Sequence, residues 1–309
     1  MTFRMSDRKK KGKNISGWIL IDKPRGISSS AVVNKIKWCL NAKKAGHAGT
    51  LDPEATGLLV VALGEATKTI SFITEAFKSY DFTINLGSQT TTDDLEGEII
   101  KSSTNRPNKK DIQTALTKFH GEISQVPPQF SAVKINGERA YKQARKGHHL
   151  KLKPRLLKIE YLKLAEIHDS HSISLKLRCG KGGYVRSIAR DLGIELGCFA
   201  HVRSLKRTAS GPFKIENAIS FDIFNNKGQD SCLKEWILPL EYGLKELSKI
   251  KIDHLSVKKL KHGLPIECQK NDTTEEANAW ASFNNKAIAI VNCRDGILYP
   301  SKVFLNNDY

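Results

Sequence analysis

The sequence predicts an α+β fold built on a mixed, mainly antiparallel central sheet with flanking helices. Strand-like and helix-like segments are interspersed along residues 17–247 without the regular strand–helix–strand order of a doubly wound fold. Two segments alternate apolar and polar residues, "SYDFTINLG" at 79–87 and "SISLKLRC" at 172–179. Several short strand candidates then crowd into residues 264–304, which is typical of a small β-barrel module. One large domain followed by a small one is therefore expected.

The first four elements follow from local patterns. Residues 17–22, "GWILID", form an expected strand, and Ser28 or Ser29 is expected to cap the helix that follows over 29–42. That helix places four apolar residues on one face: Val32, Val33, Ile36 and Leu40. The run "LLVVAL" at 58–63, bounded by glycines, predicts a buried strand, and residues 65–77 predict a second helix.

The later elements continue this mixture of strands and helices. A helix is expected over 111–120, and the strand at 172–179 leads into an expected helix over 184–197. A stretch of lower complexity, "FNNKGQDSCLKEW", precedes a domain boundary near residue 248. Beyond it the sequence predicts a helix over 254–263 and strands at 264–268, 278–283, 286–293 and 296–304.

The charge of the chain indicates a polyanionic partner. The 309 residues carry a formal net charge of +18, with a pI of about 9.6 and 39% hydrophobic residues. So basic a chain with an ordinary core favours nucleic acid as the partner; a solubilising surface and an anionic membrane are the alternatives. Residues 134–158 concentrate the charge, with nine lysines and arginines against one acid, Glu138. This stretch is expected to be a mobile clamp on phosphates rather than a plain solvated face.

Three segments are expected to differ in character. Residues 1–16 are basic, lack the apolar region of a signal peptide, and are expected to form a disordered arm. Residues 17–247 form the large domain, with a basic insertion at about 125–158, and residues 248–309 form the small module. No apolar run approaches the roughly 20 residues of a membrane span. The six cysteines lack C-x-x-C spacing, which predicts buried thiols in a reducing cytoplasm.

The main candidate for chemistry is the segment "GHAGTLDPEATGLL" at 46–59. It holds a single aspartate, Asp52, before a proline, and an ordinary Asp-Pro turn is the structural alternative. Its glycines allow another backbone to come close, and the buried strand after it predicts a rigid loop. An isolated carboxylate on a rigid loop suits nucleophilic or proton-abstracting chemistry, provided that a cation keeps it ionised.

Other candidate residues each have a plain structural alternative. Arg186, at the start of an expected helix, is the candidate cation or else a surface salt-bridge partner. Tyr80 is by default a core tyrosine, unless its phenol faces a cleft. His47 is a loop surface residue or a stacking partner for an unpaired base. Asp93 and Asp94 in "TTTDD" are candidate Mg²⁺ ligands, although a solvated turn is expected.

The segment at 46–59 resembles the signature loop of the TruB-type tRNA pseudouridine synthases, which act on the T-loop uridine. Six further stretches are similar to that family in the same order: "IDKPRGISS", "KSYDF", "LGSQTTTDDLEG", "QVPPQFSAVKINGERAYKQAR", "CGKGGYVRSIARDLG" and "HVRSLKRTASGPF". The resemblance runs from about residue 17 to 215, and the tail resembles the PUA-type RNA-binding module of bacterial members.

The resemblance implies a pseudouridine synthase fold and a reaction that converts uridine in the T-arm of tRNA to pseudouridine, without a metal or organic cofactor. It implies that Asp52 is the catalytic aspartate, that Tyr80 stacks on the target base, and that Arg186 keeps Asp52 ionised. Whether Asp52 attacks C1′ or first abstracts the 2′ proton stays open. A cytoplasmic monomer is expected.

The resemblance also implies a set of residues that bind substrate and RNA: Lys23, His47, Tyr184, Leu205, Lys134, Arg145 and Arg207. Within this set Lys23 would order the Asp52 loop, His47 would stack where the T-loop is opened, and Leu205 would line the base pocket. The basic insertion would close over the T-loop.

Two other functions are compatible with parts of the sequence. One is a tRNA-binding or tRNA-folding protein in which catalysis is secondary; a missing aspartate or arginine would favour it, and both are present. The other is a metal-dependent RNA hydrolase that uses Asp93 and Asp94. No P-loop, dinucleotide fingerprint or zinc-enzyme motif occurs in the sequence.

Overall fold

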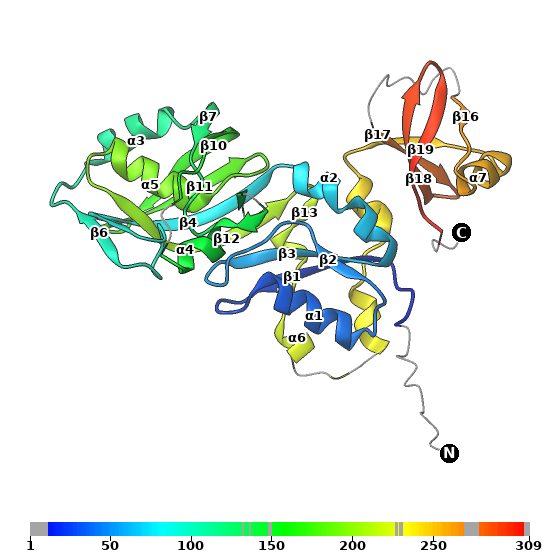
Figure 1. The fold of residues 1–309 in the computed structure, drawn as a ribbon, viewed down its shortest axis with the longest axis horizontal. Helices are drawn as coiled ribbons and strands as arrows, with labels where there is room; N and C mark the ends of the chain where they lie inside the picture. The colour runs from blue at the N-terminus through cyan, green and yellow to red at the C-terminus, as the bar shows by residue number, and fades with distance from the viewer. Residues whose placement is uncertain are drawn as a thin grey trace. The chain divides into compact units, whose positions relative to one another are not determined.

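The computed structural model describes residues 12–131, 133–135, 137–147, 150–225, 228, 231–268 and 278–305 (Figure 1). Four side chains within these ranges lie outside the description: Lys134, Arg145, Ser231 and Cys232. The chain divides into two compact units. The first comprises residues 1–52, 59–74 and 211–309, and the second comprises residues 53–58 and 75–210. The expected large domain is therefore shared between both units, and the expected small module belongs to the first.

The first unit contains strands in the order β14-β1-β3, with β2 antiparallel to β3. These strands are β1 (Gly17–Lys23), β2 (Ala45–His47), β3 (Thr56–Leu63) and β14 (Ile219–Ser220). Its helical elements are α1 (Ser29–Cys39), η1 (Gly64–Thr69), α2 (Ile70–Glu75), η2 (Ile215–Asn217), α6 (Asp222–Asn225), η3 (Ser231–Trp236) and η4 (Leu240–Leu244). Every residue of β3 after Thr56 is buried, as the glycine-bounded apolar run predicts.

Local chemistry explains where these helices begin. The Ser28 side chain accepts a hydrogen bond from the backbone N–H of Ala31, so Ser28 rather than Ser29 caps α1. The predicted helix at 65–77 is instead divided into η1 and α2. The hydroxyls of Thr67 and Thr69 donate to carbonyls three residues earlier, at 2.6 and 2.8 Å, which suits the tighter 3₁₀ turn.

The second unit is built on the antiparallel strand order β12-β4-β11-β10-β7, and the first residues of β3 run parallel to β12. These strands are β4 (Lys78–Leu86), β7 (Gly121–Gln125), β10 (Arg155–Ile167), β11 (Ser172–Cys179) and β12 (Ala200–Ser210). Helices α3 (Lys109–Thr117) and α5 (Val185–Glu195) contribute to the hydrophobic core against this sheet (Figure 1). The predicted α+β class and the mainly antiparallel sheet are confirmed.

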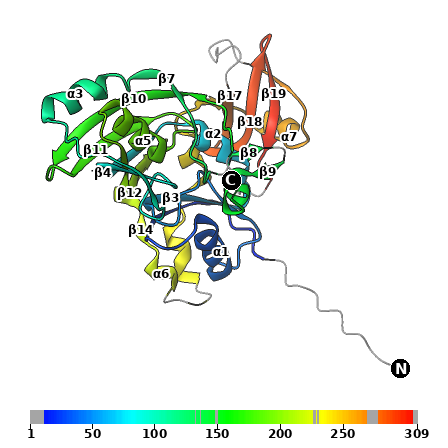
Figure 2. The same cartoon turned by 60° about the vertical axis from the view of Figure 1, so that its left-hand side comes forward.

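Two long strands of the second unit, β10 and β12, were not expected. Their polar residues obscure the alternation, as in "AHVRSLKRTAS" of β12. Because β7 ends at Gln125 and β10 begins at Arg155, the basic insertion occupies residues 126–154. It contains the hairpin of β8 (Lys134–Ile135) and β9 (Glu138–Arg139), labelled in Figure 2, followed by α4 (Ala140–Arg145). A second short hairpin pairs β5 (Ser88–Thr90) with β6 (Ile99–Ser102).

The C-terminal part of the first unit carries its own five-stranded sheet, in the order β15-β17-β18-β19-β16. The elements are β15 (Ser248–Lys251), α7 (His254–Lys261), β16 (Ile266–Glu267), β17 (Asn278–Phe283), β18 (Lys286–Arg294) and β19 (Ile297–Val303). A separate apolar cluster fills it, including Ile250, Leu260, Ile288 and Leu298. The predicted helix and strands are present, and β15 adds a strand at the predicted boundary. This sheet is consistent with a PUA-like module.

The described structure begins at residue 12, within the segment that was expected to be disordered. Residues 1–11 lie outside the described residues, but the backbone N–H of Lys13 donates to the carbonyl of Asn41 at 2.6 Å. Ser16 Oγ accepts from the N–H of Glu65 at 3.1 Å. Disorder was therefore the wrong expectation for residues 12–16, because these residues satisfy backbone groups of the folded chain.

The cysteines are mostly internal, as predicted. Cys39, Cys179, Cys198 and Cys293 are buried, Cys268 is partly exposed, and Cys232 lies outside the described side chains. Burial raises the pKa of the Cys179 thiol to about 12, so it is inert as a nucleophile. Over the described ranges, helices long and apolar enough to cross a membrane are absent.

Candidate active site

Asp52 lies on a loop between β2 and β3 that is fixed on both sides. Before it, the Ser29 hydroxyl donates to the carbonyl of Leu51 and accepts from its N–H, both at 2.8 Å. After it, Thr56 Oγ1 donates to the carbonyl of Leu205 at 3.2 Å. Asp52 itself is partly exposed, between Leu51, which is buried, and Pro53, which is exposed. Hydrogen bonds thus hold Leu51 within the first unit and Thr56 within the second, and the rigidity of the loop stays a prediction.

Gly57 allows the backbone at the start of β3 to lie close to the backbone of β12. Its φ of +94° is in the region that favours glycine, and a Cβ there would lie 2.4 Å from the carbonyl oxygen of Arg207. Gly57 is opposite Arg207 in the β3–β12 pairing, and Arg207 is opposite Tyr80 in the β12–β4 pairing. The segment after Asp52 thus enters the sheet in register with Tyr80.

Tyr80 and Arg207 form a buried pair. Tyr80 is 7% exposed and belongs to the apolar core, and a side-chain hydrogen bond links it to Arg207. Arg207 is 1% exposed, and its Nε donates to the carbonyl of Leu58 at 2.8 Å. Burial lowers the pKa of the Arg207 guanidinium, and Tyr80 opposes that shift. The Arg207 side chain is thus bonded to Tyr80 and to the backbone of β3, and its predicted role in binding RNA stays a prediction.

Arg186 is buried in the second unit rather than exposed in a surface salt bridge. It is the second residue of α5 and is 7% exposed. Its Nη1 donates to the carbonyl of Thr92 at 3.2 Å, and its Nη2 donates to the carbonyl of Phe130 at 3.0 Å. Nη1 also lies 3.6 Å from Oδ2 of Asp94. These acceptors fix the orientation of the planar guanidinium.

Asp93 and Asp94 correct the expectation of a solvated turn. They are 5% and 9% exposed, and each faces an arginine of α5. Asp94 Oδ1 accepts from Thr92 Oγ1 and from the N–H of Glu96. Burial raises the pKa of Asp93 above its ordinary value, while Arg190 acts in the opposite direction. In the sequence these residues are two adjacent acids in a threonine-rich turn. Their burial was not predicted because their arginine partners lie far along the chain.

Lys23 connects indirectly to the Asp52 loop. Its side chain is fully buried, and Nζ donates to the carbonyls of Pro24 and Ile27 at 2.8 and 2.9 Å. These bonds shape the turn before α1, and the first residue of α1, Ser29, binds Leu51. The arrangement is compatible with the predicted role of Lys23 in ordering this loop.

The remaining predicted residues occupy varied positions. His47 ends β2 opposite Val61 and is partly exposed. Tyr184 precedes α5, where its backbone exchanges hydrogen bonds with the Gln125 side chain at 3.0 and 3.3 Å. Leu205 lines a cavity of about 330 Å³ beside residues of β4 and β11, and neither Tyr80 nor Arg186 lines it. The predicted role of Leu205 in a base pocket stays a prediction.

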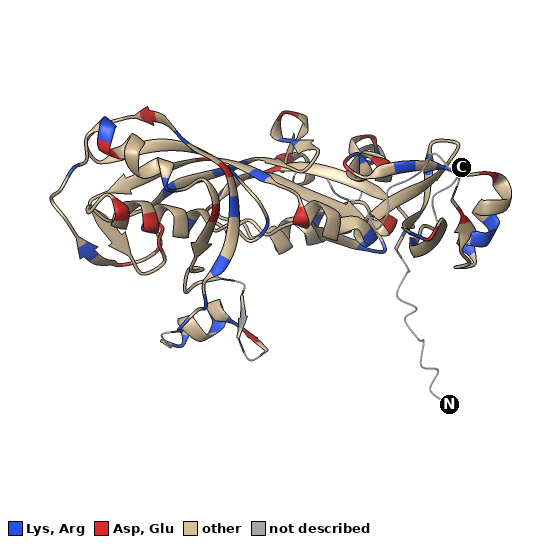
Figure 3. Cartoon of the chain, turned by 90° about the horizontal axis from the view of Figure 1, so that it is seen from above, with Lys and Arg blue, Asp and Glu red and all other residues tan. Residues whose placement is uncertain are grey.

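The basic insertion presents lysines to solvent. Lys142, Lys146, Lys151 and Lys153 are exposed, while Lys134 and Arg145 lie outside the described side chains. Lys146 lies 3.4 Å from Glu138. Figure 3 shows lysine and arginine (blue) on many further elements of both units. The insertion is therefore one part of a widely distributed positive charge.

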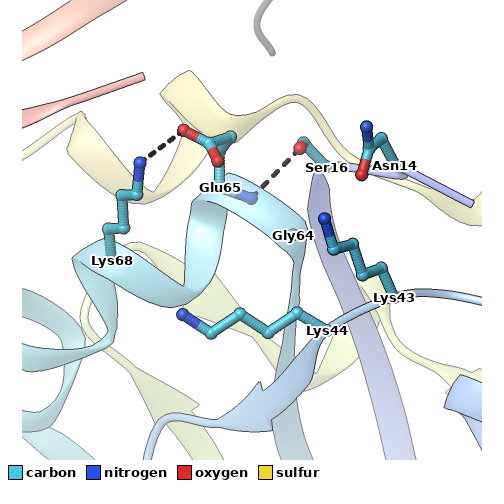
Figure 4. A pocket seen from close by; sticks show the side chains of 7 residues that line it. All are labelled: Asn14, Ser16, Lys43, Lys44, Gly64, Glu65 and Lys68. Carbon is cyan, nitrogen blue, oxygen red and sulfur yellow. Dashed lines mark hydrogen bonds and ion pairs between the residues drawn. The ribbon is translucent and has the colours of Figure 1, made fainter. Parts of the chain in front are cut away.

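A second basic feature is a pocket of the first unit (Figure 4). It has a volume of about 320 Å³ and is lined by Asn14, Ser16, Lys43, Lys44, Gly64, Glu65 and Lys68. Glu65 accepts from Lys68 Nζ at 2.8 Å, and Lys68 also donates to the carbonyl of Val303 at 2.7 Å. Three lysines against one acid favour an anion over a cation in this pocket.

The predicted residues are divided between the two units. Lys23, His47 and Asp52 belong to the first, and the division falls directly after Asp52. Tyr80 and Arg186 belong to the second, so the pairing of Asp52 with Arg186 stays a prediction. Among the described residues, no group of three or more His, Cys, Asp and Glu side chains is placed to hold a metal ion.

Family models match residues 37–245, and two relatives align with nearly the whole chain. Residues 37–185 match the model of the N-terminal domain of TruB family pseudouridylate synthases. Residues 186–245 match the tRNA pseudouridylate synthase B C-terminal domain. A tRNA pseudouridine synthase B of Ruegeria sp. (strain TM1040) is 51% identical over 96% of this chain and 98% of its own length. A protein of the same name from Dinoroseobacter shibae is 50% identical with the same coverage.

Solved structures show the same fold. A Cbf5-Nop10-Gar1 complex contains a chain with a TM-score of 0.71 and 27% identity, which covers 94% of this chain and 85% of that one. An H/ACA RNP bound to a substrate RNA containing 2′-deoxyuridine contains a chain with a TM-score of 0.71 and 25% identity, over 94% and 86%.

Proposed function

Because this chain belongs to the TruB family of pseudouridylate synthases, we propose that it isomerises a uridine in the T-loop of tRNA to pseudouridine. The relatives that are about half identical carry the name tRNA pseudouridine synthase B, which supports tRNA as the substrate. The proposed enzyme acts as a monomer in the cytoplasm. Its basic character and the lysine-lined pocket are compatible with a polyanionic substrate.

The observation that carries the proposed mechanism is the register of β3, β12 and β4. Gly57, five residues after Asp52, is aligned through Arg207 with Tyr80. The loop that ends in this register is held by Ser29 and Thr56. This register supports the proposal because the loop that carries the single carboxylate leads into β3, and only β12 separates β3 from the strand of Tyr80.

The proposed reaction exchanges bonds within one nucleotide. The N1–C1′ bond of the uridine breaks, the uracil rotates, and a new bond joins C5 to C1′. The hydrogen on C5 is lost as a proton and N1 gains one, so atoms and electrons balance without an oxidant, a reductant or a cofactor. Asp52 serves either as the nucleophile at C1′ or as the base that removes the 2′ proton. Tyr80 stacks against the base, and Arg186 keeps Asp52 ionised.

The target base must leave its stack before this chemistry begins. Flipping a base costs a few kcal/mol, which protein contacts must offset. In the proposed complex His47 stacks where the base has left, Leu205 lines the base pocket, and lysines of the insertion bind phosphates. A water-poor site would then strengthen the electrostatic effect of a single carboxylate.

Neutralising the insertion is expected to weaken RNA binding and its dependence on salt. In the quadruple variant Lys142→Gln, Lys146→Gln, Lys151→Gln and Lys153→Gln, each lost phosphate contact should reduce the slope of log Kobs against log[salt] by about 0.7 to 0.9. Filter binding of a T-arm RNA over a salt series measures this slope. Lys118→Gln, which breaks an exposed pair with Glu195, is the single-charge control. An unchanged slope in the quadruple variant would remove the insertion from the RNA interface.

Mass-spectrometric mapping of pseudouridine in treated tRNA tests the proposed function directly. We expect one new pseudouridine in the T-loop of an unmodified transcript incubated with the protein. A tRNA-binding or tRNA-folding protein would instead bind the transcript and leave its uridines unchanged. A metal-dependent hydrolase would cut the strand, and EDTA would prevent the cut.

A further inference from the structure

Arg190 lies one helical turn after Arg186 on α5, so both side chains project from the same face of the helix. Its Nη1 lies 3.1 Å from Oδ2 of Asp93, and its Nε lies 2.8 Å from Oδ1 of Asp191. Its Nη2 donates to the carbonyl of Val126 at 2.8 Å. The side chain is 15% exposed, and all three of its nitrogens are engaged.

The two loops that Arg190 contacts are the loops that hold Arg186. The first loop, residues 90–94, supplies the Thr92 carbonyl and the Asp94 carboxylate to Arg186. The second loop, residues 126–131, supplies the Phe130 carbonyl. Arg190 contacts the first loop at Asp93, between those two acceptors, and the second loop at its first residue, Val126. Each loop is therefore fixed to α5 by both arginines.

The backbone of the first loop is also held by hydrogen bonds of Asp93. This residue has a φ of +60°, a left-handed conformation that is uncommon outside glycine but that aspartate adopts more readily than most residues. Its N–H donates to the carbonyl of Thr90 at 3.3 Å, and its carbonyl accepts from Val202 at 3.0 Å. The Asp93 carboxylate is buried, faces Arg190 and also accepts from Gln89 Nε2 at 3.4 Å, so losing Arg190 would remove the ion-pair partner of a buried charge.

The second loop is anchored twice near its start. The carbonyl of Val126 accepts from Ser187 Oγ as well as from Arg190, both at 2.8 Å. Ser187 follows Arg186 on α5. Because these bonds fix the start of the loop, they also limit the positions open to Phe130, four residues later.

We propose that Arg190 and Asp93 are positioning residues for Arg186: their ion pair fixes the two loops whose oxygens aim the Arg186 guanidinium. The inference rests on the proposed function, in which Arg186 pairs with Asp52. A displacement of about 1 Å in a catalytic group can cost about a hundredfold in rate, so loosening either loop affects the chemical step. Arg190 and Asp93 themselves touch neither the base nor the ribose in this proposal.

The test compares Arg190→Gln, Asp93→Asn and the double variant with the parent protein. We expect the single-turnover rate of pseudouridine formation at saturating protein to fall about 10- to 100-fold in each single variant. The dissociation constant for the T-arm RNA should change by less than about threefold, since the lost interaction orients a group without binding RNA. The double variant should be no slower than the slower single variant, because both substitutions break the same pair.

Arg190→Lys and Arg178→Gln serve as the matched variants. Lysine keeps the charge beside Asp93 without the planar fork, so Arg190→Lys should recover part of the lost rate. Arg178 of β11 pairs with Glu160 of β10 at 2.8 Å, and Arg178→Gln should keep the parent rate. Thermal unfolding of every variant ensures that rates are compared on folded protein.

Two outcomes separate this inference from the proposed function. Folded Arg190→Gln and Asp93→Asn with single-turnover rates within about threefold of the parent rate would overturn the positioning role. Should Arg190→Gln fail to fold, Asp93→Asn decides alone, because it leaves the bonds from Arg190 to Val126 and Asp191 in place. A parent protein that forms no pseudouridine would overturn the proposed function instead.

Discussion

Asp52→Asn is expected to abolish pseudouridine formation, with a fall of at least about a thousandfold in the single-turnover rate. An amide is nearly the same size as the carboxylate, but it neither attacks C1′ nor removes the 2′ proton. The loop should keep its conformation, because Leu51 and Thr56 are held by bonds that do not involve Asp52. The loss should therefore be chemical rather than structural.

The measurement pairs pseudouridine quantification with RNA binding. Glu54→Gln is the matched control, since it changes an acid to its amide two residues further along the same loop. We expect this control to keep the parent rate, and both variants to bind the T-arm RNA nearly as well as the parent. Turnover by the Asp52→Asn protein at anything near the parent rate would contradict the catalytic assignment.

Arg186→Gln is expected to destabilise the protein and inactivate it together. Removing one partner of a buried ion pair costs about 3–5 kcal/mol, because the Asp94 carboxylate stays buried without its cation. The carbonyls of Thr92 and Phe130 also lose a charged donor. Urea unfolding should show the lower free energy of unfolding, and single-turnover kinetics should show the loss of rate.

A second substitution separates these two effects. In the double variant Arg186→Gln and Asp94→Asn the uncompensated charge is removed, so part of the lost free energy of unfolding should return. The rate should stay low, because Asp52 still lacks its proposed cation. Recovery of rate and stability in parallel would show that Arg186 acts only through the fold. Arg178→Gln, which breaks a half-exposed pair with Glu160, should cost at most about 1 kcal/mol.

Local patterns predicted most of the elements that position the candidate site. The alternation in β4 and β11, the apolar run of β3 and the helix of Arg186 are all present within a few residues of their expected bounds. These elements bury one face or are buried completely, so their sequences show a periodic pattern or a continuous run of apolar residues. β12 was missed because it carries several polar and charged side chains. One of them, Arg207, is buried in the sheet, and periodicity does not reveal the burial of an arginine.

The acids at 93 and 94 show the limit of sequence patterns most clearly. Two adjacent aspartates in a threonine-rich turn are ordinarily exposed, because burying a carboxylate is costly. Here they are buried against Arg186 and Arg190, which belong to a helix over 90 residues later in the chain. The sequence of the turn itself does not predict that these arginines are its partners.

The sequence by itself determined the fold class, the basic character and the family, because these depend on composition, periodicity and ordered motifs. The tertiary structure decided which charged side chains are buried and what they face. Arg207 turns inward to Tyr80, and Asp93 and Asp94 meet the arginines of α5. The physical reason is that the free energy of a buried charge depends on its partner, and here each partner comes from a distant element of the fold.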